Sequence, residues 1–428
     1  MTRTVPMVSP GDWSQRPTPE HAERAAAVAP DESTLAHSVH ASFDEITKHQ
    51  PEWDRFVEDC CGDLFSTFDW CRIWWRYYGH GRRLEIHLFR EGGRLVGVFP
   101  CFRETLRFGF VGVQLIRLVG CDHSVTTCGF AVDSERMSQI VAKLMDRISQ
   151  GPTWDMIHLG PLPGYFCGRE CVARAFADHP AAGRVLSSAD DGPHIVFDLP
   201  ATYEAYLSKL TPRERNNIRS RKRKLEKSHS VFESTASTDD VSAWFDSFVP
   251  QHQRQWHVEN KLGHFRDWPG SEAFHREAAT TMAELGRLRL LCLDVDGNAA
   301  GFQYNYQFGP RIHWVLGSRD HDSYWDQYSL GRRLHCATVE RAIAEGVTQI
   351  DAMRGMYDYK LQLGGTLLKL QSIAIVRRGV FSGARVRWAR SAARMLHLLY
   401  YRIWFGRVAP RVPFLRRPLW RRWIRSRI

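Results

Sequence analysis

The segment Tyr328–Arg333, with the sequence YSLGRR, places a small residue, a glycine and two arginines at the start of a predicted helix. Apolar side chains then recur at near-helical spacing as far as Gly346, a typical helix terminator. The first turn of a helix exposes about four unpaired backbone N–H groups at the positive end of the helix dipole. Ser329–Arg332 therefore suit a pyrophosphate, and Gly331 would allow its close approach. The alternative is an ordinary helix cap.

Three alternating segments precede this helix. Leu288–Val295, Ala299–Phe308 and Arg311–Ser318 are predicted strands, and turn residues separate them. A further predicted strand, Val347–Met353, follows the helix. An antiparallel hairpin, a third strand, a helix and a last strand therefore have to position the phosphate site.

The first half of the chain repeats this order. Leu84–Glu91 and Arg94–Phe102 alternate in character, and Gly92-Gly93 between them predicts a tight hairpin. Helical aromatic sequence precedes each hairpin, at Phe65–Gly79 and at Val241–Trp256. We therefore expect an α/β fold built from two copies of one unit, each a mixed, mostly antiparallel sheet flanked by helices.

The segments YSLGRRL and DAMRGMYDYKLQLGG, in this order of elements, resemble the CelD-type (BioF2-like) acetyltransferases. These are a branch of the acyl-CoA N-acyltransferase (GNAT) superfamily associated with cellulose and exopolysaccharide biosynthesis, and they are related to the Fem aminoacyl transferases. FDWCRIWWRYYG and RLVGVFPCF also look like the opening unit of that family. The resemblance implies two tandem GNAT-like units. We expect a disordered leader at 1–36, the units at 37–190 and 191–380 with the acyl donor in the second, and a basic aromatic tail at 381–428.

In the superfamily, a motif Q/R-x-x-G-x-G/A binds the CoA pyrophosphate through backbone amides at a helix N-terminus. The run that matches it here consists of Tyr328, Ser329, Leu330, Gly331, Arg332 and Arg333. Tyr328 replaces Gln or Arg, and Arg333 replaces the final small residue, so that only the first glycine is present. The two arginines either add charge to a phosphate site or mark a degenerate one.

The acyl transfer that the resemblance implies needs a base for the nucleophile and an acid for the leaving thiolate. Asp351 could accept a proton or orient an amine, or it could pair with Arg354, which is itself a candidate for binding substrate. Tyr357 could act as the acid or only pack its ring. Lys360 could bind an anionic group of the substrate or donor, or remain a solvated charge.

One predicted strand carries four further polar residues, which are Gln303, Tyr304, Asn305 and Tyr306. Because neighbouring residues of a strand face opposite sides, either the Gln–Asn pair or the Tyr pair faces the cleft. The pattern does not choose between them, so Gln303 and Asn305 are substrate-binding candidates and Tyr304 is a catalytic candidate. His313 and His257 are further candidate bases, although a lone histidine is more often structural.

The net charge of +11 is concentrated at the end of the chain. Residues 359–428 hold two lysines, fifteen arginines and no acidic residue, a formal +17, which leaves the first 358 residues at −6. In the acidic body, the basic run Arg213–Lys227 is either a solvated helix face or a rim that attracts CoA phosphates or an anionic glycan. Nucleic acid is not an expected partner, because no aromatic residue for base stacking interrupts that run.

In the tail, arginines alternate with tryptophan, tyrosine and leucine from Arg385 to Ile428. This composition favours an anionic membrane surface over packing on the body and over nucleic acid. No apolar stretch approaches the roughly 20 residues that span a bilayer, and charged residues interrupt the apolar runs near the N-terminus, so we expect no secretory signal. The ten cysteines lack zinc-finger spacing, which indicates reduced thiols. We expect a cytoplasmic protein held at the inner face of the membrane, without a metal.

The expected function is transfer of an acyl group, acetyl in the first instance, from acyl-CoA to an amine or hydroxyl of a sugar or surface-polysaccharide precursor. Acetyl-CoA is the expected co-substrate. Two alternatives remain open: a Fem-like aminoacyl transferase that uses aminoacyl-tRNA, and a non-catalytic scaffold of a polysaccharide-synthesis complex at the membrane surface.

Overall fold

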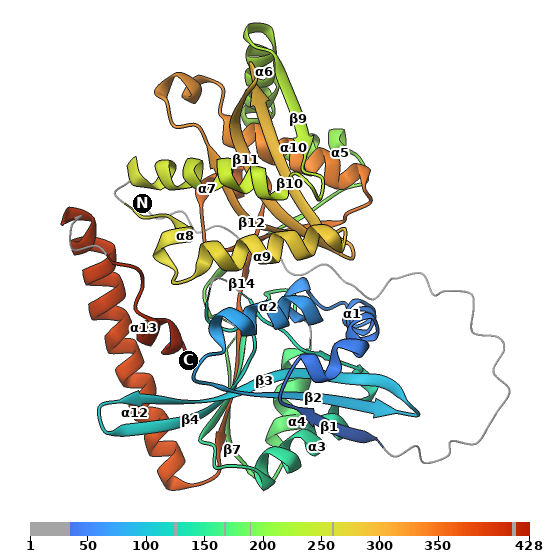
Figure 1. Ribbon diagram of the computed structural model, residues 1–428, viewed down its shortest axis with the longest axis vertical. Helices are drawn as coiled ribbons and strands as arrows, with labels where there is room; N and C mark the ends of the chain where they lie inside the picture. Colours follow the sequence, from blue (N-terminus) through green and yellow to red (C-terminus); the bar gives the residue numbers. More distant parts are fainter. Residues whose placement is uncertain (1–34, 124–126, 167, 189, 259–260, 413–416) are drawn as a thin grey trace, which may run out of the picture. The chain divides into compact units, whose positions relative to one another are not determined.

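The computed structural model describes residues 35–123, 127–166, 168–188, 190–258, 261–412 and 417–428 (Figure 1). These residues form two β-sheets flanked by helices, so the predicted α/β architecture is confirmed. The predicted leader, 1–36, lies outside the described residues except for Leu35 and Ala36, where the first strand begins.

The first sheet has the strand order β1–β2–β3–β4–β6–β15–β7, and β5 pairs with β3. The predicted hairpin is confirmed: β2 and β3 pair antiparallel around Gly92-Gly93, where both residues have positive φ as this type of turn requires. β4 and β6 are parallel. The bounds are β1 Ala36–His40, β2 Arg83–Glu91, β3 Arg94–Phe108, β4 Val111–Leu118, β5 Ala131–Val132, β6 Met156–Leu162, β7 Ala182–Ser188 and β15 Gln371–Arg377.

The second sheet has the order β9–β10–β11–β12–β13–β8–β14. The three predicted strands are confirmed as β10, β11 and β12, which pair antiparallel in sequence order, and β13 lies parallel to β12. The bounds are β8 Pro193–Asp198, β9 Val231–Thr235, β10 Leu288–Val295, β11 Asn298–Phe308, β12 Arg311–Arg319, β13 Gln349–Arg354 and β14 Thr366–Lys369.

The two sheets have equivalent pairings, and the first sheet contains one strand from the range 191–380. The parallel pair β4–β6 corresponds to β12–β13. Beside β6 lies β15, which comes after the strands of the second sheet in the sequence, and beside β13 lies β8, which is the first strand of the second sheet in the sequence. The range 191–380 therefore includes one strand of the first sheet, and the division of the chain at residue 190 stays a prediction.

Helices cover both faces of the second sheet, with α7 and α9 on one face and α10 on the other. The bounds are α1 Gln50–Asp59, α2 Phe68–Tyr78, α3 Met137–Gln150, α4 Arg169–Ala177, α5 Tyr203–Lys209, α6 Pro212–Ser228, α7 Val241–Val258, α8 His264–Asp267, α9 Ser271–Glu284, α10 Leu330–Ala344, α11 Asp358–Gln362, α12 Val380–Leu396 and α13 Arg421–Arg425. A π-helical segment, His397–Val408, continues α12.

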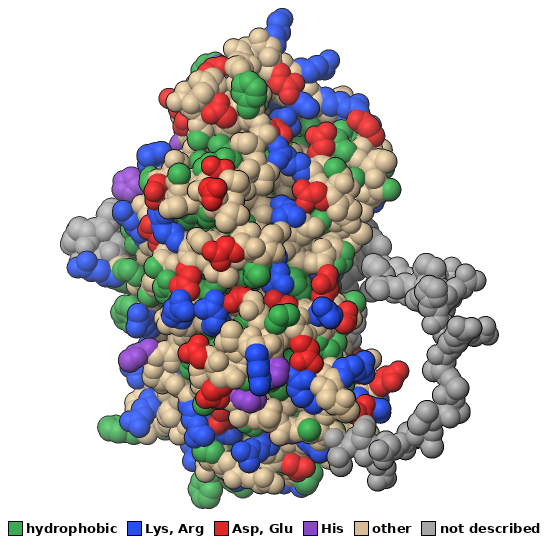
Figure 2. All heavy atoms as spheres, turned by 45° about the vertical axis from the view of Figure 1, so that its right-hand side comes forward, with side chains coloured by type: hydrophobic (Ala, Val, Ile, Leu, Met, Phe, Trp, Pro, Cys, Tyr) green, Lys and Arg blue, Asp and Glu red, His purple; other side chains and the backbone are tan. Residues whose placement is uncertain are grey.

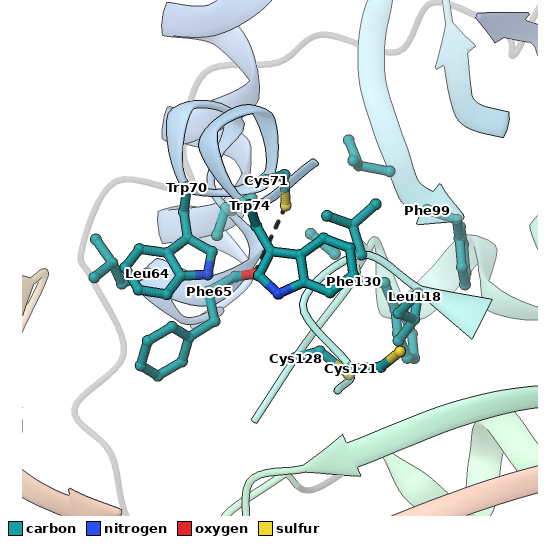
Figure 3. Packing of buried hydrophobic residues seen from close by; sticks show 14 of the residues in the cluster. Leu64, Phe65, Trp70, Cys71, Trp74, Phe99, Leu118, Cys121, Cys128 and Phe130 are labelled. Carbon is teal, nitrogen blue, oxygen red and sulfur yellow. Dashed lines mark hydrogen bonds between the residues drawn. The ribbon is translucent and has the colours of Figure 1, made fainter. Parts of the chain in front are cut away.

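Helix α2 joins the two sheets, because apolar residues lie on nearly all sides of it. Trp74 stacks on Phe102 of β3, with ring centroids 5.9 Å apart. Trp70 contacts Tyr306 of β11 edge-on, at 5.6 Å. Figure 3 shows both tryptophan rings within one buried cluster, which also includes Phe130 of the first unit. Buried aromatic side chains each remove a large apolar area from water, so this contact fixes the sheets against each other.

The tail packs on the first sheet. Val386, Ala389 and the C-terminal Ile428 contact the apolar cluster of β4 and β15, and α12 runs beside β4 (Figure 1). Packing on the body, the alternative weighed for this segment, is therefore present, and membrane binding stays a prediction. Among the described residues, no helix is both long enough and apolar enough to cross a membrane.

Candidate active site

Strands β12 and β13 pair over only a short distance. Their parallel register runs from the pair Arg311–Gln349 to the pair His313–Asp351. Both strands continue further, but there β12 pairs with β11 and β13 pairs with β8. Within the described residues, the edge of β12 beyond His313 therefore has no strand partner on this side, and its backbone groups can bind a ligand.

The amine of Lys360 lies between the two strands just beyond their last pair. Nζ donates a hydrogen bond to the carbonyl oxygen of Ala352 at 2.7 Å and lies 5.2 Å from the ring centroids of Trp314 and Tyr357. The residue is only 6% exposed, so Lys360 is not a solvated charge. Burial lowers the pKa of Lys360 to about 8, against the opposing attraction of Asp351. An amine with this pKa can accept and return a proton near neutral pH.

Helix α10 begins where the sequence predicts. Ser329 is its N-cap, in the left-handed conformation with φ 55°, and the helix starts at Leu330. The amides of Leu330 and Gly331 belong to the first turn, where helical geometry supplies no backbone acceptor. Among the described atoms, a Cβ on Gly331 would meet only Cδ of Arg319, at 3.7 Å. The surface beside Gly331 is therefore open.

The arginines at this helix start differ in their partners. Arg332 forms a 2.6 Å ion pair with Glu214 of α6, and Arg333 pairs with glutamates of β9 and α6. Their charges are thus balanced within the protein. Arg221 of α6 instead donates a hydrogen bond to the hydroxyl of Ser329. Of these three arginines, Arg221 is the one that adds positive charge to the dipole of α10.

One segment of the chain contains the open edge of β12, the buried amine of Lys360 and the N-terminus of α10. Residues 212–361 match the family model described as an acetyltransferase (GNAT) domain. This segment belongs to the GNAT acetyltransferases. It runs from α6 to α11 and so includes β12, α10, β13 and Lys360. The chain is therefore an acyltransferase enzyme, and its assignment to the CelD type stays a prediction.

FemX, a protein of known structure, shares the fold of the GNAT domain together with the first unit. The crystal structure of FemX superposes with a TM-score of 0.57 at 11% identity, covering 80% of this chain and 97% of FemX. L-PGS from Bacillus licheniformis gives a TM-score of 0.45 at 9% identity, covering 80% and 96%. A tandem GNAT protein from the clavulanic acid biosynthesis pathway gives 0.39 at 13% identity, covering 81% and 99%. No curated protein matches the chain in sequence.

In the GNAT domain, Asp351 is fully buried. Its carboxylate accepts hydrogen bonds from Nε2 of His194 at 2.7 Å, the hydroxyl of Tyr165 at 2.9 Å and the amide of Met353 at 2.7 Å. Burial opposes ionisation, but His194 and His313 together hold the pKa of Asp351 well below its ordinary value. Because its oxygens are occupied, Asp351 is suited to holding His194 and β13 in place rather than to taking a proton from a substrate.

The polar network around Asp351 connects the GNAT domain to the first unit. Asp63, which precedes α2, accepts hydrogen bonds from Arg311 at 2.8 Å and from the hydroxyl of Tyr165 at 3.0 Å. His313 lies between the two carboxylates, 3.8 Å from each. Burial and the two carboxylates raise the pKa of Tyr165 well above its ordinary value, so its hydroxyl remains a donor. The network fixes the end of the β12–β13 pairing.

Strand β11 divides its four polar candidates between two faces. Gln303 and Asn305 lie on the α10 side and are hydrogen-bonded to each other at 3.1 Å. Gln303 also lies 3.5 Å from the carbonyl oxygen of Leu316, in the part of β12 that follows the register shift. Tyr304 and Tyr306 face α7 and α9, and their hydroxyls are hydrogen-bonded to each other. The structure therefore brings Gln303 and Asn305 close to the open part of β12 and places Tyr304 on the opposite face of the sheet.

The turn before α11 carries the exposed candidates. Tyr357 packs its ring on Gly355, which has a φ of 125° and where an added Cβ would lie 2.8 Å from that ring. Arg354 donates to the carbonyl oxygen of Asp191 at 3.0 Å and does not pair with Asp351. Several large apolar side chains around Lys360 are exposed, as a binding surface requires. They are Met356, Tyr357, Tyr359, Leu361 and Leu367.

Sequence reasoning missed Asp63, Tyr165 and His194. His194 and Tyr165 lie 157 and 186 residues from Asp351 in the chain, so no local spacing joins them to it. The one available signal was the histidine at the start of an apolar strand, PHIVFD, because a buried polar side chain needs a partner. Of the two histidines singled out, His313 joins the network, whereas His257 is exposed at the end of α7.

Proposed function

We propose that this enzyme transfers an acyl group, acetyl in the simplest case, from acyl-CoA to an amine or hydroxyl of a sugar or surface-polysaccharide precursor. The observation that carries the proposal is the buried amine of Lys360 at the point where β12 and β13 stop pairing. In acyl transfer the reacting carbonyl has to meet a base in a site that excludes bulk water. Lys360 meets both conditions.

The residues present fit an acyl-CoA donor. The free amides of Leu330 and Gly331, with Arg221 beside them, suit the pyrophosphate. The open surface at Gly331 supports close approach of a phosphate. The unpaired edge of β12 offers backbone hydrogen bonds to the amide groups of a pantetheine arm. Gln303 and Asn305 remain the candidates that orient the substrates beside this edge.

In the proposed reaction, neutral Lys360 accepts a proton from the acceptor as its nitrogen or oxygen bonds to the thioester carbon. The carbon–sulfur bond then breaks, and the ammonium of Lys360 returns the proton to the leaving thiolate. A pKa of about 8 suits both steps, since it is close to the ordinary thiol value of about 8.5. Tyr357, which is 49% exposed, is the second candidate acid.

We assign Asp351 a positioning role in this scheme. It binds His194 and the backbone of β13, and its charge raises the pKa of Lys360. The exposed apolar side chains around α11, which include Met356 and Leu361, are the proposed approach for the acceptor. We further propose that the enzyme is cytoplasmic and that its tail, 381–428, holds it at the inner face of an anionic membrane.

Calorimetry with acetyl-CoA, combined with thiol release in the presence of amino sugars and neutral sugars, tests this function. We expect saturable binding by the wild type and turnover with at least one sugar acceptor. Aminoacyl-tRNA belongs in the same series. If it bound more tightly than acetyl-CoA, with steep salt dependence, the Fem-like alternative would replace this proposal. If neither bound, the scaffold alternative would.

A further inference from the structure

A groove of about 490 Å³ lies between α12 and the paired strands β7 and β15. Glycines at positions 183, 379 and 383 form part of its wall, which brings the backbone close to the space. The remaining wall is dominated by six arginines, and no acidic residue contributes to it. They are Arg184, Arg377, Arg378, Arg387, Arg390 and Arg394.

Among the described residues, none of these six arginines forms an ion pair within the protein. Arg385, on another side of α12, shows the contrast, because it pairs with the buried carboxylate of Asp155. On the face drawn in Figure 2, basic and acidic side chains are likewise interspersed. Six cations gathered without an ion-paired carboxylate repel one another, and an anion in the groove would relieve that repulsion.

Arg390 is the arginine most affected by this crowding. It is half-buried, and burial together with the charges of Arg394 and Arg184 lowers the pKa of its guanidinium, against the opposing attraction of Asp191. A lowered pKa means that the folded protein disfavours the charged form of this side chain. Since an arginine stays protonated, that unfavourable energy is available to bind an anion.

An exposed apolar stripe runs along α12 beside the groove. Phe381, Trp388 and Met395 follow one another at intervals of seven residues, and they are 81%, 53% and 62% exposed. Leu399, one turn further on, is 54% exposed. Val386 and other small side chains on the opposite side bury the helix against the first sheet, so the stripe cannot turn inward. Arginine beside exposed apolar residues is the composition of a helix at a membrane interface.

We propose that this groove binds the phosphate group of an anionic membrane lipid while the stripe Phe381, Trp388, Met395 and Leu399 enters the interface. The inference deepens the membrane partner proposed above and does not depend on the acyl-transfer reaction. RNA also carries phosphates, and Phe381 and Trp388 could stack on bases, but Met395 and Leu399 continue the stripe with side chains that have no ring, which favours a lipid interface.

Sedimentation of the full chain with vesicles tests the groove. Vesicles of phosphatidylcholine containing phosphatidylglycerol should bind the wild type, and pure phosphatidylcholine should bind it weakly. Arg390→Gln with Arg394→Gln should reduce the affinity about 30-fold, from the contribution of each basic residue at such a surface. The matched control is Arg213→Gln with Arg223→Gln, which removes the same charge from exposed positions of α6 and should change affinity less than about threefold.

Two further experiments distinguish a lipid phosphate from a free phosphate. Phe381→Ser with Trp388→Ser should weaken vesicle binding while leaving the competition by glycerol phosphate unchanged. If these substitutions had no effect and glycerol phosphate displaced all vesicles, the groove would be a site for a free phosphate and the lipid proposal would be wrong. It would also be wrong if the groove variant bound vesicles as the wild type does, or lost only a labelled RNA. Calorimetry with acetyl-CoA on each variant reports the donor site separately, so failure of one proposal is distinguishable from failure of the other.

Discussion

The parallel strand pairs β4–β6 and β12–β13 occupy equivalent positions in their sheets. The side chains that fill the space between the two strands beyond their last residue pair differ. In the first sheet the last pair is Arg117 with His158. Arg117 is completely buried, is bonded to Glu104 at 2.9 Å, and donates to the carbonyl oxygens of Arg425 and Arg427 near the end of the chain. The first pair is thus closed by ion pairs and by the tail.

The second pair is closed by one side chain. Beyond His313 and Asp351, the amine of Lys360 has one carbonyl as its hydrogen-bond partner among the described residues, and the short helix that carries it is surrounded by exposed side chains. The carboxylates beside Arg117 raise the pKa of its guanidinium despite burial, whereas burial lowers the pKa of Lys360 to about 8. The same arrangement of strands therefore holds a permanently charged arginine in the first sheet and an amine able to exchange protons in the second. The difference arises because carboxylates surround Arg117, whereas burial dominates at Lys360.

The largest expected effect comes from Lys360→Met, which keeps an unbranched side chain one atom shorter and removes the proton acceptor. We expect kcat to fall about 1,000-fold, within the range for loss of a general base, while calorimetry should find acetyl-CoA binding within about threefold of the wild type. Lys48→Met, at an exposed position before α1, is the matched control. Unchanged turnover in Lys360→Met would remove Lys360 from the catalytic scheme.

Arg117→Met should affect stability instead. The substitution removes one of the two arginine partners of the buried carboxylates of Glu104 and Asp122, and Arg82 remains as the other. We expect a cost of about 3 kcal/mol in the free energy of unfolding, at the lower end for a broken buried ion pair. Urea denaturation measures this loss, and acetyl-CoA binding below the transition should stay at the wild-type level. Loss of donor binding in the folded variant would show that the first pair also takes part in catalysis.

Gly331→Glu should weaken the donor site specifically. There is room for a side chain at this position, so the fold should be kept, but a carboxylate at the start of α10 would repel a pyrophosphate. We expect acetyl-CoA affinity to fall on the order of 30-fold with kcat nearly unchanged. Gly331→Ala, which adds only a methyl group, should bind normally. Equal affinity of both variants would place the pyrophosphate elsewhere.

The smallest expected effect is the dependence of kcat/KM on pH, which should change about tenfold per pH unit below the pKa of the acting group. Because the neutral form of Lys360 acts first, kcat/KM should rise with pH up to about 8 and then level off. The opposite slope would identify the ammonium as the acting form.

The free energy of unfolding should also rise with pH. Between the pKa of about 8 in the folded protein and the ordinary value of 10.5, the unfolded chain holds a proton on Lys360 that the folded chain has released. The wild type should therefore gain stability with rising pH in this range, and Lys360→Met should not.

The local sequence determined the helices and strands of the second unit and the start of α10. Alternation over Leu288–Val295 and Arg311–Ser318 predicted β10 and β12, and helical spacing after Ser329 predicted α10. These features are local, because side-chain periodicity and turn residues act within a few positions of the chain. The excess of arginine in the tail was equally visible in the sequence.

Only the tertiary structure decided which of those residues meet. Strand β15 enters the sheet of the first unit, His194 reaches Asp351 across 157 residues, and Lys360 is buried instead of solvated. Each outcome depends on strand pairing and burial between distant segments, which no short pattern encodes. The pKa of Lys360 follows from that burial, so the sequence determined that an amine stands at this position, and the fold decided that it can take part in proton transfer.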